Sequence, residues 1–106
     1  MIFNPDWLKK MTNYIRSQVG RVYVYANEEK LEGVVETSID QDGVIHVIAV
    51  WDTEEFNQRS LDIHSVEVWD TMGDLMLTEQ TEDTAKVQGM SFYFELQIQI
   101  SEREAD

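Results

Sequence analysis

The sequence predicts a mainly β domain of the α+β class, in which an N-terminal amphipathic helix precedes about six antiparallel strands. Two observations lead to this prediction. Apolar residues recur with helical spacing up to residue 20 and with a period of two from residue 21 onward. The expected strands are joined by turns and loops, and no segment between them reads as the crossover helix that parallel strands require. We therefore expect either a β-sandwich or a strongly bent antiparallel sheet.

The helix is predicted over residues 4–20. Asn4 suits an N-cap, because its side-chain oxygen accepts a bond from a free backbone N–H of the first turn. Phe3 and Leu8 stand at the two positions of a hydrophobic staple. Gly20 is the expected stop. The apolar side of the helix is formed by Trp7, Leu8, Met11, Ile15 and Val19.

The β body is expected over residues 21–101, followed by a polar tail at 102–106. A bend or bulge is predicted near Gly33, because glycine interrupts a strand pattern there. The run 44–51 is apolar at nearly every position, which is typical of a central strand covered on both faces. The expected strands are 21–26, 31–39, 44–51, 61–69, 75–77 and 90–101.

Polar segments separate these strands. Residues 27–30, 40–43 and 70–74 are predicted to be turns, since they carry the Asn, Asp and Gly residues that turns select. Residues 52–60 are expected to form a polar loop. The acidic segment 78–89 is expected to be a long loop with at most a short strand at 85–88.

The composition fits a single domain over residues 1–106. Hydrophobic residues make up 42% of the chain, which is enough for one core. The absence of cysteine excludes disulfides and thiol chemistry. The sequence shows neither a secretory signal nor an apolar run of the roughly 20 residues that span a membrane. We therefore expect a protein that is cytoplasmic when synthesised and that does not act in a membrane.

The charge is distributed unevenly. Residues 1–21 hold four basic side chains and one acidic one, whereas residues 22–106 hold four basic and twenty acidic ones. A body this acidic repels phosphate backbones, so no direct binding of nucleic acid is expected. The acidity either keeps the domain soluble or attracts a basic partner.

No catalytic, cofactor-binding or metal-binding residues are predicted. Asp40 and Asp42 resemble the start of a calcium loop, but Trp51 occupies the position of the closing glutamate, so a hairpin turn is the better interpretation. His46 and His64 fall on different predicted strands, and nothing in the sequence assembles them into a zinc site. The chain has no nucleophile elbow and no phosphate-binding loop. We therefore expect a protein that is not an enzyme.

The candidate interaction surface combines helix and strand positions. The polar side of the predicted helix faces solvent or a partner. Tyr23 and Tyr25 share a face with Arg21, and two tryptophans end strands. Such rings suit a sugar-binding platform or ordinary packing. The candidate residues are Lys9, Lys10, Asn13, Arg16, Tyr23, Tyr25, Trp51 and Trp69.

Four segments carry a resemblance to a known group of proteins. They are Trp7-Leu8-Lys9-Lys10 to Tyr14-Ile15, Val44-Ile45-His46-Val47, Ser65-Val66-Glu67-Val68 followed by Asp70 and Gly73-Asp74-Leu75, and Phe92 to Ile100 with Glu102 behind it. In these segments the chain resembles small phage and prophage proteins encoded in the tail-fibre and lysis region of Gram-positive bacteria. Some members carry the label ketopantoate hydroxymethyltransferase, a much larger barrel enzyme that this chain is too short to form. The resemblance assigns no functional residues.

Three functions are open at this point. The resemblance implies a non-enzymatic structural or accessory protein of a phage tail or tail fibre, cytoplasmic at first and then part of the virion. Its partners would be other tail proteins, further copies of itself, or both. The acidic body suggests instead an inhibitor that mimics phosphate toward a host nucleic-acid-binding protein. The aromatic strand ends suggest a small carbohydrate-binding module.

Overall fold

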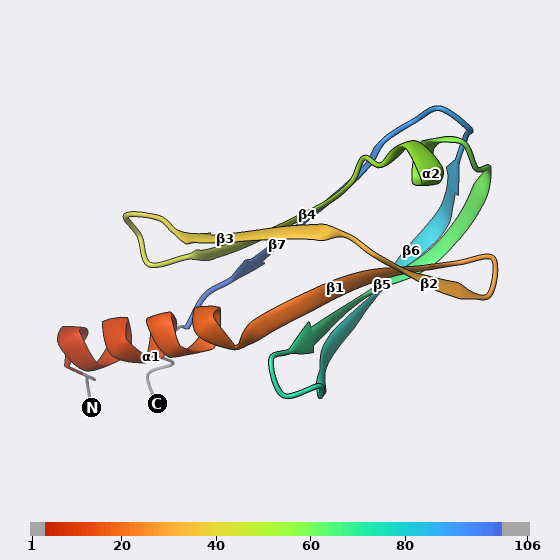
Figure 1. The fold of residues 1–106 in the computed structure, drawn as a ribbon. Coiled ribbons are helices and arrows are strands. Elements are labelled where there is room, and N and C mark those ends of the chain that lie inside the picture. Colours follow the sequence, from red (N-terminus) through yellow and green to blue (C-terminus); the bar gives the residue numbers. More distant parts are fainter. Residues whose placement is uncertain (1–3, 101–106) are drawn as a thin grey trace.

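The computed structural model describes residues 4–100, and for residues 82–84 it describes the backbone alone. The strands form two antiparallel sheets (Figure 1). Sheet A has the order β2-β1-β5-β6 and sheet B the order β3-β4-β7. The mainly β prediction is therefore confirmed. The elements are α1 (Pro5–Gln18), β1 (Val19–Ala26), β2 (Glu29–Glu32), β3 (Val34–Ile39), β4 (Ile45–Trp51), α2 (Glu54–Asn57), β5 (Leu61–Asp70), β6 (Leu75–Lys86) and β7 (Phe92–Ile98).

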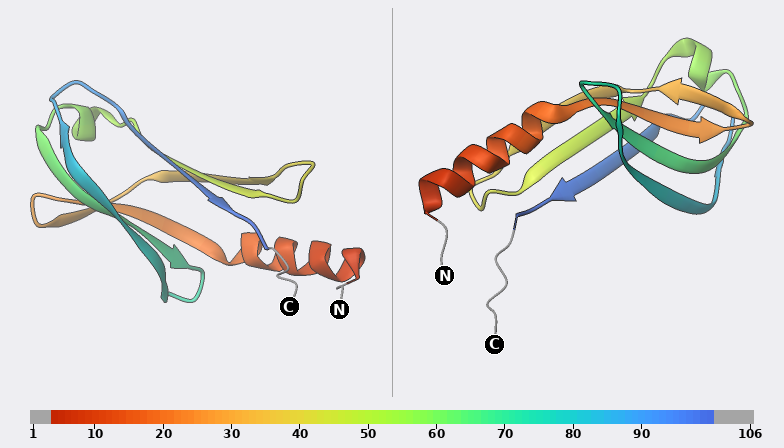
Figure 2. Two further views of the ribbon diagram at one scale, coloured as in Figure 1. Left: turned by 180° about the vertical axis from the view of Figure 1, so that it is seen from behind. Right: turned by 90° about the horizontal axis from the view of Figure 1, so that it is seen from below.

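Each of the two architectures expected from the sequence is present in part. The sheets lie face to face as in a sandwich, and sheet A is strongly curled along β5 and β6 (Figures 1 and 2). The molecule measures 52 × 27 × 26 Å. Its length comes from α1, which extends beside β3 at one end, while α2 lies at the other end (Figure 1).

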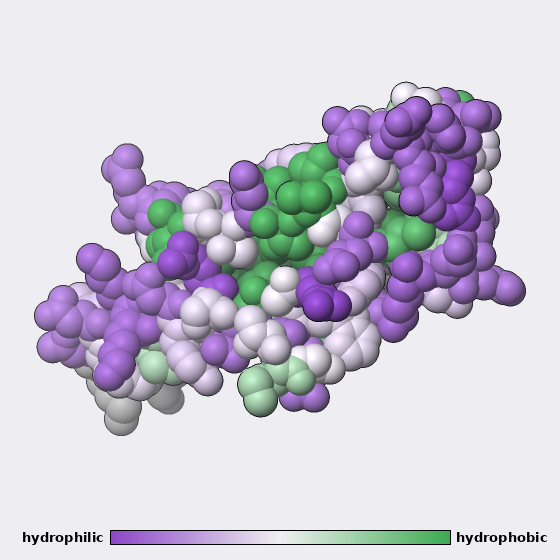
Figure 3. All heavy atoms as spheres, viewed as in Figure 1, coloured by the Kyte–Doolittle hydropathy of each residue, from purple (hydrophilic) through white to green (hydrophobic). Residues whose placement is uncertain are grey.

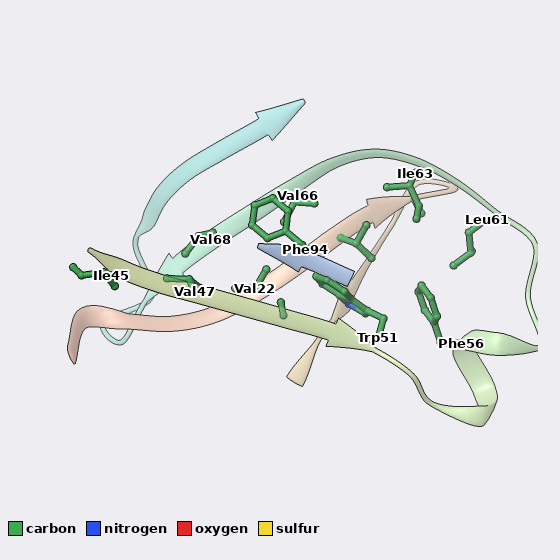
Figure 4. Close-up of a cluster of buried hydrophobic side chains, with 13 residues drawn as sticks. Val22, Ile45, Val47, Trp51, Phe56, Leu61, Ile63, Val66, Val68 and Phe94 are labelled. Carbon is green, nitrogen blue, oxygen red and sulfur yellow. The ribbon is translucent and has the colours of Figure 1, made fainter. Parts of the chain in front are cut away.

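The core lies between the two sheets and follows from alternation along each strand (Figure 4). Every second residue of β1 from Val22 onward, and of β4 along its whole length, points inward and is buried, while its neighbours are only half-buried or exposed. Each fully buried aliphatic side chain stabilises the fold by roughly 1.5–3 kcal/mol. Phe56 of α2 closes one end of the core. The buried apolar residues are Val22, Val24, Ala26, Ile45, Val47, Ala49, Trp51, Phe56, Leu61, Ile63, Val66, Val68 and Phe94.

The chain passes from sheet A to sheet B at Gly33. The expected strand 31–39 is therefore two strands, β2 and β3, and the predicted bend is the point at which the chain changes sheets. The Gly33 backbone N–H donates to the Val22 carbonyl over 3.0 Å. The indole N–H of Trp51 donates to the Leu31 carbonyl over 2.8 Å, which ties β4 of one sheet to β2 of the other.

The start of the helix agrees with the sequence, but its end does not. The Asn4 side chain accepts from the Asp6 backbone N–H over 2.8 Å, which confirms the N-cap. Phe3 of the expected staple lies outside the described residues. The prediction that Gly20 ends the helix is wrong, because α1 ends at Gln18 and Gly20 belongs to β1. From Val19 onward the chain pairs as β1 with β5 and no longer continues the helix. The Gln18 carbonyl accepts from the Thr71 N–H over 2.9 Å.

The prediction of a loop at 78–89 is also wrong. Residues 75–86 form β6, which pairs with β5 along its length with irregularities in the register. The strand lies at the edge of sheet A, so most of its described side chains face water and show no alternation. Backbone pairing with β5 keeps it in place, together with the half-buried side chains of Met76 and Leu77, which pack against the core.

The predicted polar loop 52–60 contains a short helix, α2, capped by the Thr53 side chain. The expected covering of the 44–51 strand on both faces is corrected as well. One face of β4 is buried, whereas the other carries the half-buried side chains of His46, Ile48 and Val50. Among the described residues, no second layer of secondary structure covers that outer face of sheet B.

Two of the predicted turns share one construction. In residues 40–43, the Asp40 carboxylate accepts from the backbone N–H groups of Asp42 and Val44, over 2.8 and 3.1 Å. In residues 70–74, the Asp70 carboxylate accepts from those of Met72 and Asp74, over 2.9 and 2.8 Å. Both turns are confirmed, and the third is shorter than expected, since Glu29 already belongs to β2.

Candidate functional site

The surface offers two places where side chains of functional interest gather. On the face seen in Figure 3, apolar surface lies over the middle of the molecule, and hydrophilic side chains cover α1 and the end that carries α2. One gathering lies on the outer face of sheet A around Trp69. The other lies on the outer face of sheet B around His46.

The first gathering lines an open hollow of about 740 Å³, which we call the Trp69 hollow. Its floor comes from the outer faces of β1, β2 and β5. The register places Arg21 opposite Trp69 across β1 and β5, and the alternation of β1 brings Tyr23 to the same face. Its rim is the turn after β5. The lining residues are Gly20, Arg21, Tyr23, Lys30, Trp69, Asp70, Thr71, Met72 and Gly73.

The side chains of the hollow hold one another in place. The indole N–H of Trp69 donates to Glu67 Oε1 over 3.0 Å. Lys30 Nζ lies 3.0 Å from the same oxygen and 4.8 Å from the centre of the indole ring. An ammonium at this distance from a ring centre is attracted by the ring's electrons. The orientation of Trp69 is therefore set by its neighbours.

A second pair lies at the other side of the hollow. Arg21 Nε is 3.6 Å from Glu32 Oε1, and an Arg21 guanidinium N–H donates to the Tyr23 hydroxyl over 3.4 Å. The Tyr23 hydroxyl, followed by Glu32, raises the pKa of Arg21, so this group stays charged at any physiological pH. Each of the two cations of the hollow thus faces one carboxylate.

The structure divides the strand residues of the candidate interaction surface. Tyr23 and Trp69 line the same hollow. Tyr25 lies next to it on the same face of β1, opposite Lys30 and Ser65, but does not line it. Trp51 is not on the surface at all: it is 2% exposed and belongs to the core. Its inclusion in an interaction surface is therefore corrected. As the last residue of β4 it points into the core, where its ring lies 5.3 Å from that of Phe92.

The helix residues of that candidate surface lie apart from the hollow. Lys9, Lys10 and Asn13 are exposed, and Arg16 is half-buried near the end of α1. Lys9 and Asn13 line a groove between α1 and the acidic turn 40–43. The helix and strand residues therefore do not form one surface.

The second gathering is a chain of hydrogen bonds across sheet B, which we call the His46 clamp. His46 Nε2 lies 2.8 Å from Asp40 Oδ2, and His46 Nδ1 lies 3.2 Å from Glu95 Oε1. The Tyr93 hydroxyl donates to the other Glu95 oxygen over 3.1 Å. The clamp links the turn after β3 to β4 and β7.

Both ring nitrogens of His46 are engaged in the clamp. Both imidazole nitrogens face carboxylates, so neither is free to take a proton from a substrate. Hydrogen bonds from Asp40 first and Glu95 second raise the pKa of His46. The same bonds lower the pKa values of Asp40 and Glu95. Partial desolvation, followed by the hydrogen bond to Glu95, raises the pKa of Tyr93.

Within residues 4–100, side chains of 82–84 apart, no group of three or more His, Asp or Glu side chains is placed to hold a metal ion. His64 lies 3.7 Å from Asp62 on exposed positions of β5, in the sheet that does not contain His46. None of the helices described has the length and apolar character to cross a membrane.

Sequence reasoning missed Lys30 in the hollow, its partner Glu67 next to the hollow, and Asp40 and Glu95 in the clamp. The spacing of Glu67 and Trp69, two residues apart on one strand, is a signal for a shared face. Lys30 and Glu95 gave no such signal, because each meets its partner only through the pairing of strands: Lys30 of β2 reaches Glu67 of β5 across β1, and Glu95 of β7 lies next to His46 of β4.

The chain was compared with known proteins on three levels. Neither protein-family models, nor curated proteins, nor solved structures give a match to it.

Proposed function

We propose that this protein is a non-enzymatic accessory or structural component of a phage or prophage tail or tail fibre, and that it works by binding through the Trp69 hollow. The hollow is the observation that carries the binding role. It gathers two aromatic side chains and two charge pairs on an open face, and rings with polar tips are enriched in binding surfaces. The tail setting rests on the sequence resemblance.

The tail setting is tested on the particle itself. Phage particles induced from the source strain are purified, and their proteins are quantified by mass spectrometry. A fixed ratio of this chain to known tail proteins is the expected result. Its presence in the soluble lysate alone would refute the assignment.

The binding role is tested by variants in the same particles. Trp69→Ala is expected to reduce incorporation of the chain or adsorption of the particle, because Trp69 is the largest ring of the hollow. Tyr14→Ala is the matched control, since Tyr14 is an exposed aromatic residue on α1. Equal behaviour of the two variants would remove the hollow from the proposal.

Self-association belongs to the same proposal. Lys9 and Lys10 are exposed on α1 at one end of the molecule, whereas Glu54 and Glu55 are exposed on α2 at the other (Figure 1). Opposite charges at opposite ends favour head-to-tail contact between copies. The mass in light scattering is then expected to fall as salt is raised, because salt screens exposed charges. An unchanged mass would exclude this contact.

A phosphate-mimicking inhibitor receives less support. Such a protein needs its carboxylates along one face. Here Glu36 and Glu95 lie on the outer face of sheet B, and Glu32 and Glu67 on that of sheet A. Further acidic side chains lie at α2 and in the turn 40–43. This distribution favours the interpretation that the acidity keeps the protein soluble.

A further inference from the structure

We propose that the Trp69 hollow binds a neutral saccharide. The inference rests on the proposed binding role of this face and names the chemistry of its ligand. The hollow measures about 740 Å³ and is open to solvent. Ligand sites for small molecules fall between about 300 and 1,000 Å³. The volume of the hollow falls within this range.

The rings supply the first requirement of a sugar site. A pyranose presents a face of C–H groups, which packs against an aromatic side chain and removes apolar area from water. Trp69 and Tyr23 both line the hollow. The bond that Trp69 donates to Glu67 and the bond that Arg21 donates to Tyr23 hold these two side chains before a ligand arrives. Ordering costs little on binding when the site is already arranged.

The charge balance of the hollow selects a neutral ligand. Arg21 is paired with Glu32, and Lys30 with Glu67, two carboxylates next to the lining. Asp70 is an acidic residue of the lining, and its carboxylate accepts from backbone N–H groups of the turn 70–74. An anionic ligand would have to compete with these carboxylates and with the net charge of −13 on the chain. A cationic ligand would meet Arg21 and Lys30.

Hydroxyl groups satisfy both kinds of partner, because each donates one hydrogen bond and accepts others. A guanidinium has five N–H donors and an ammonium has three, so Arg21 and Lys30 retain donors beyond those in their pairs. Glu32 and Glu67 each carry two oxygens with several acceptor positions. A neutral saccharide therefore meets the donors of Arg21 and Lys30 in the lining of the hollow, and the acceptors of Glu32 and Glu67 lie next to these donors as their ion-pair partners.

The three tryptophans make the test specific. The full chain is labelled with ¹⁵N and titrated with neutral probes, N-acetylglucosamine trimer and maltotriose, and with an anionic probe, galacturonic acid trimer. We expect saturable shifts of the Trp69 indole N–H signal with at least one neutral probe and weaker ones with the anionic probe. The Trp51 signal is the internal reference, since Trp51 is buried and bonded to Leu31.

Variants then connect the shifts to the hollow. Trp69→Ala is expected to weaken binding of the neutral probe by at least about tenfold, as loss of a central aromatic anchor does. Arg21→Ala provides a second variant at an exposed position, expected to weaken binding while leaving the fold intact. Tyr14→Ala on α1 is expected to bind as the parent does. The proposal is overturned by the absence of a saturable Trp69 shift with either neutral probe, by tighter binding of the anionic probe, or by unchanged affinity in both hollow variants.

The outcomes separate this inference from the proposed function. A chain that is found in particles but binds no neutral probe retains its tail role, and its hollow is then a protein contact. A chain that binds a neutral probe through Trp69 but is absent from particles retains the saccharide site and loses the tail assignment.

Discussion

Gly33 lies directly against the indole ring of Trp51. A Cβ atom placed on Gly33 would lie 2.7 Å from Cε2 of that ring and 2.9 Å from Cζ2. The ring is in the core and its N–H is bonded to Leu31, so it is not free to move aside. The contact marks the point where the chain leaves sheet A for sheet B, and it explains why a residue without a side chain stands there.

Gly33→Ala is therefore expected to destabilise the protein by about 1–3 kcal/mol, the usual cost of overpacking a core. The free energy of unfolding is measured by urea titration. Val34→Ala is the matched control, because Val34 is the next residue and is 69% exposed. That variant is expected to remain within about 0.5 kcal/mol of the parent. Equal stability of the two variants would show that Trp51 makes room at no cost.

The turn between β1 and β2 carries strain that a glycine would relieve. Asn27 and Glu28 have φ values of 49° and 65°, the left-handed conformation required by a two-residue hairpin loop. Asn27 is tied by its side chain to Ser60 and Asp62, over 3.2 and 3.1 Å. No hydrogen bond of comparable kind fixes the side chain of Glu28 among those found in residues 4–100.

Glu28→Gly is accordingly expected to raise the free energy of unfolding by about 0.5–1 kcal/mol, because the left-handed conformation costs a side-chain-bearing residue more than it costs glycine. Thermal and urea unfolding provide the measurement. Glu28→Gln removes the same charge but keeps the Cβ atom. If the glutamine variant gains as much, the effect comes from charge and the strain argument fails.

The His46 clamp predicts a pH dependence of stability. The pKa of His46 is raised above its ordinary value of 6.5, so its contribution is complete below that pH and is lost as pH rises through the raised value. The pKa values of Asp40 and Glu95 are lowered from 3.8 and 4.5. Their contributions are present above those values and are lost as pH falls through the lowered ones.

The clamp therefore stabilises most between pH 4.5 and 6.5. The difference in unfolding free energy between the parent and His46→Gln is expected to be larger at about pH 5.5 than at about pH 8.5. Parent and variant share all acidic side chains, so the effect of their titration on stability cancels in this difference. His64→Gln, which removes the exposed histidine of β5, is the control. If this difference in unfolding free energy does not change with pH, protonation of His46 does not contribute to the stability of the fold.

Lys86 anchors the end of β6. It is 5% exposed, its Nζ donates to the Phe56 carbonyl over 2.8 Å, and it lies 4.2 Å from the centre of the Phe56 ring. Burial lowers the pKa of its ammonium, so the stabilising contacts act against a cost of desolvation.

Lys86→Ala is expected to lose about 1–3 kcal/mol, since it removes both the buried stem and the hydrogen bond. Lys86→Met keeps most of the stem and is expected to lose less than about 1 kcal/mol. Hydrogen exchange of the β6 amides shows whether the loss is local. If both variants leave stability and exchange unchanged, Lys86 does not hold the strand.

The sequence reveals elements whose signals are local. Helix capping by Asn4, the two aspartate turns and the alternation of the last strand all depend on neighbours a few residues away. The same reasoning failed for β6, because an edge strand held by backbone pairing shows no apolar period. It also failed at Gly20, where pairing with β5 rather than glycine ends the helix.

By itself the sequence determined the mainly β class and the N-terminal helix. It also determined that Arg21 and Tyr23 lie on the same face of a strand, since each of these features follows from short-range periodicity. Only the tertiary structure decided that Trp69 joins these residues while Trp51 enters the core. The period of a strand tells which residues share a face, but it does not tell which face is buried when both carry aromatic residues. The packing of the two sheets decides that, because it buries the inner face of each sheet. Strand pairing then brings Lys30 of β2 and Arg21 of β1 to the outer face of β5, which carries Glu67 and Trp69.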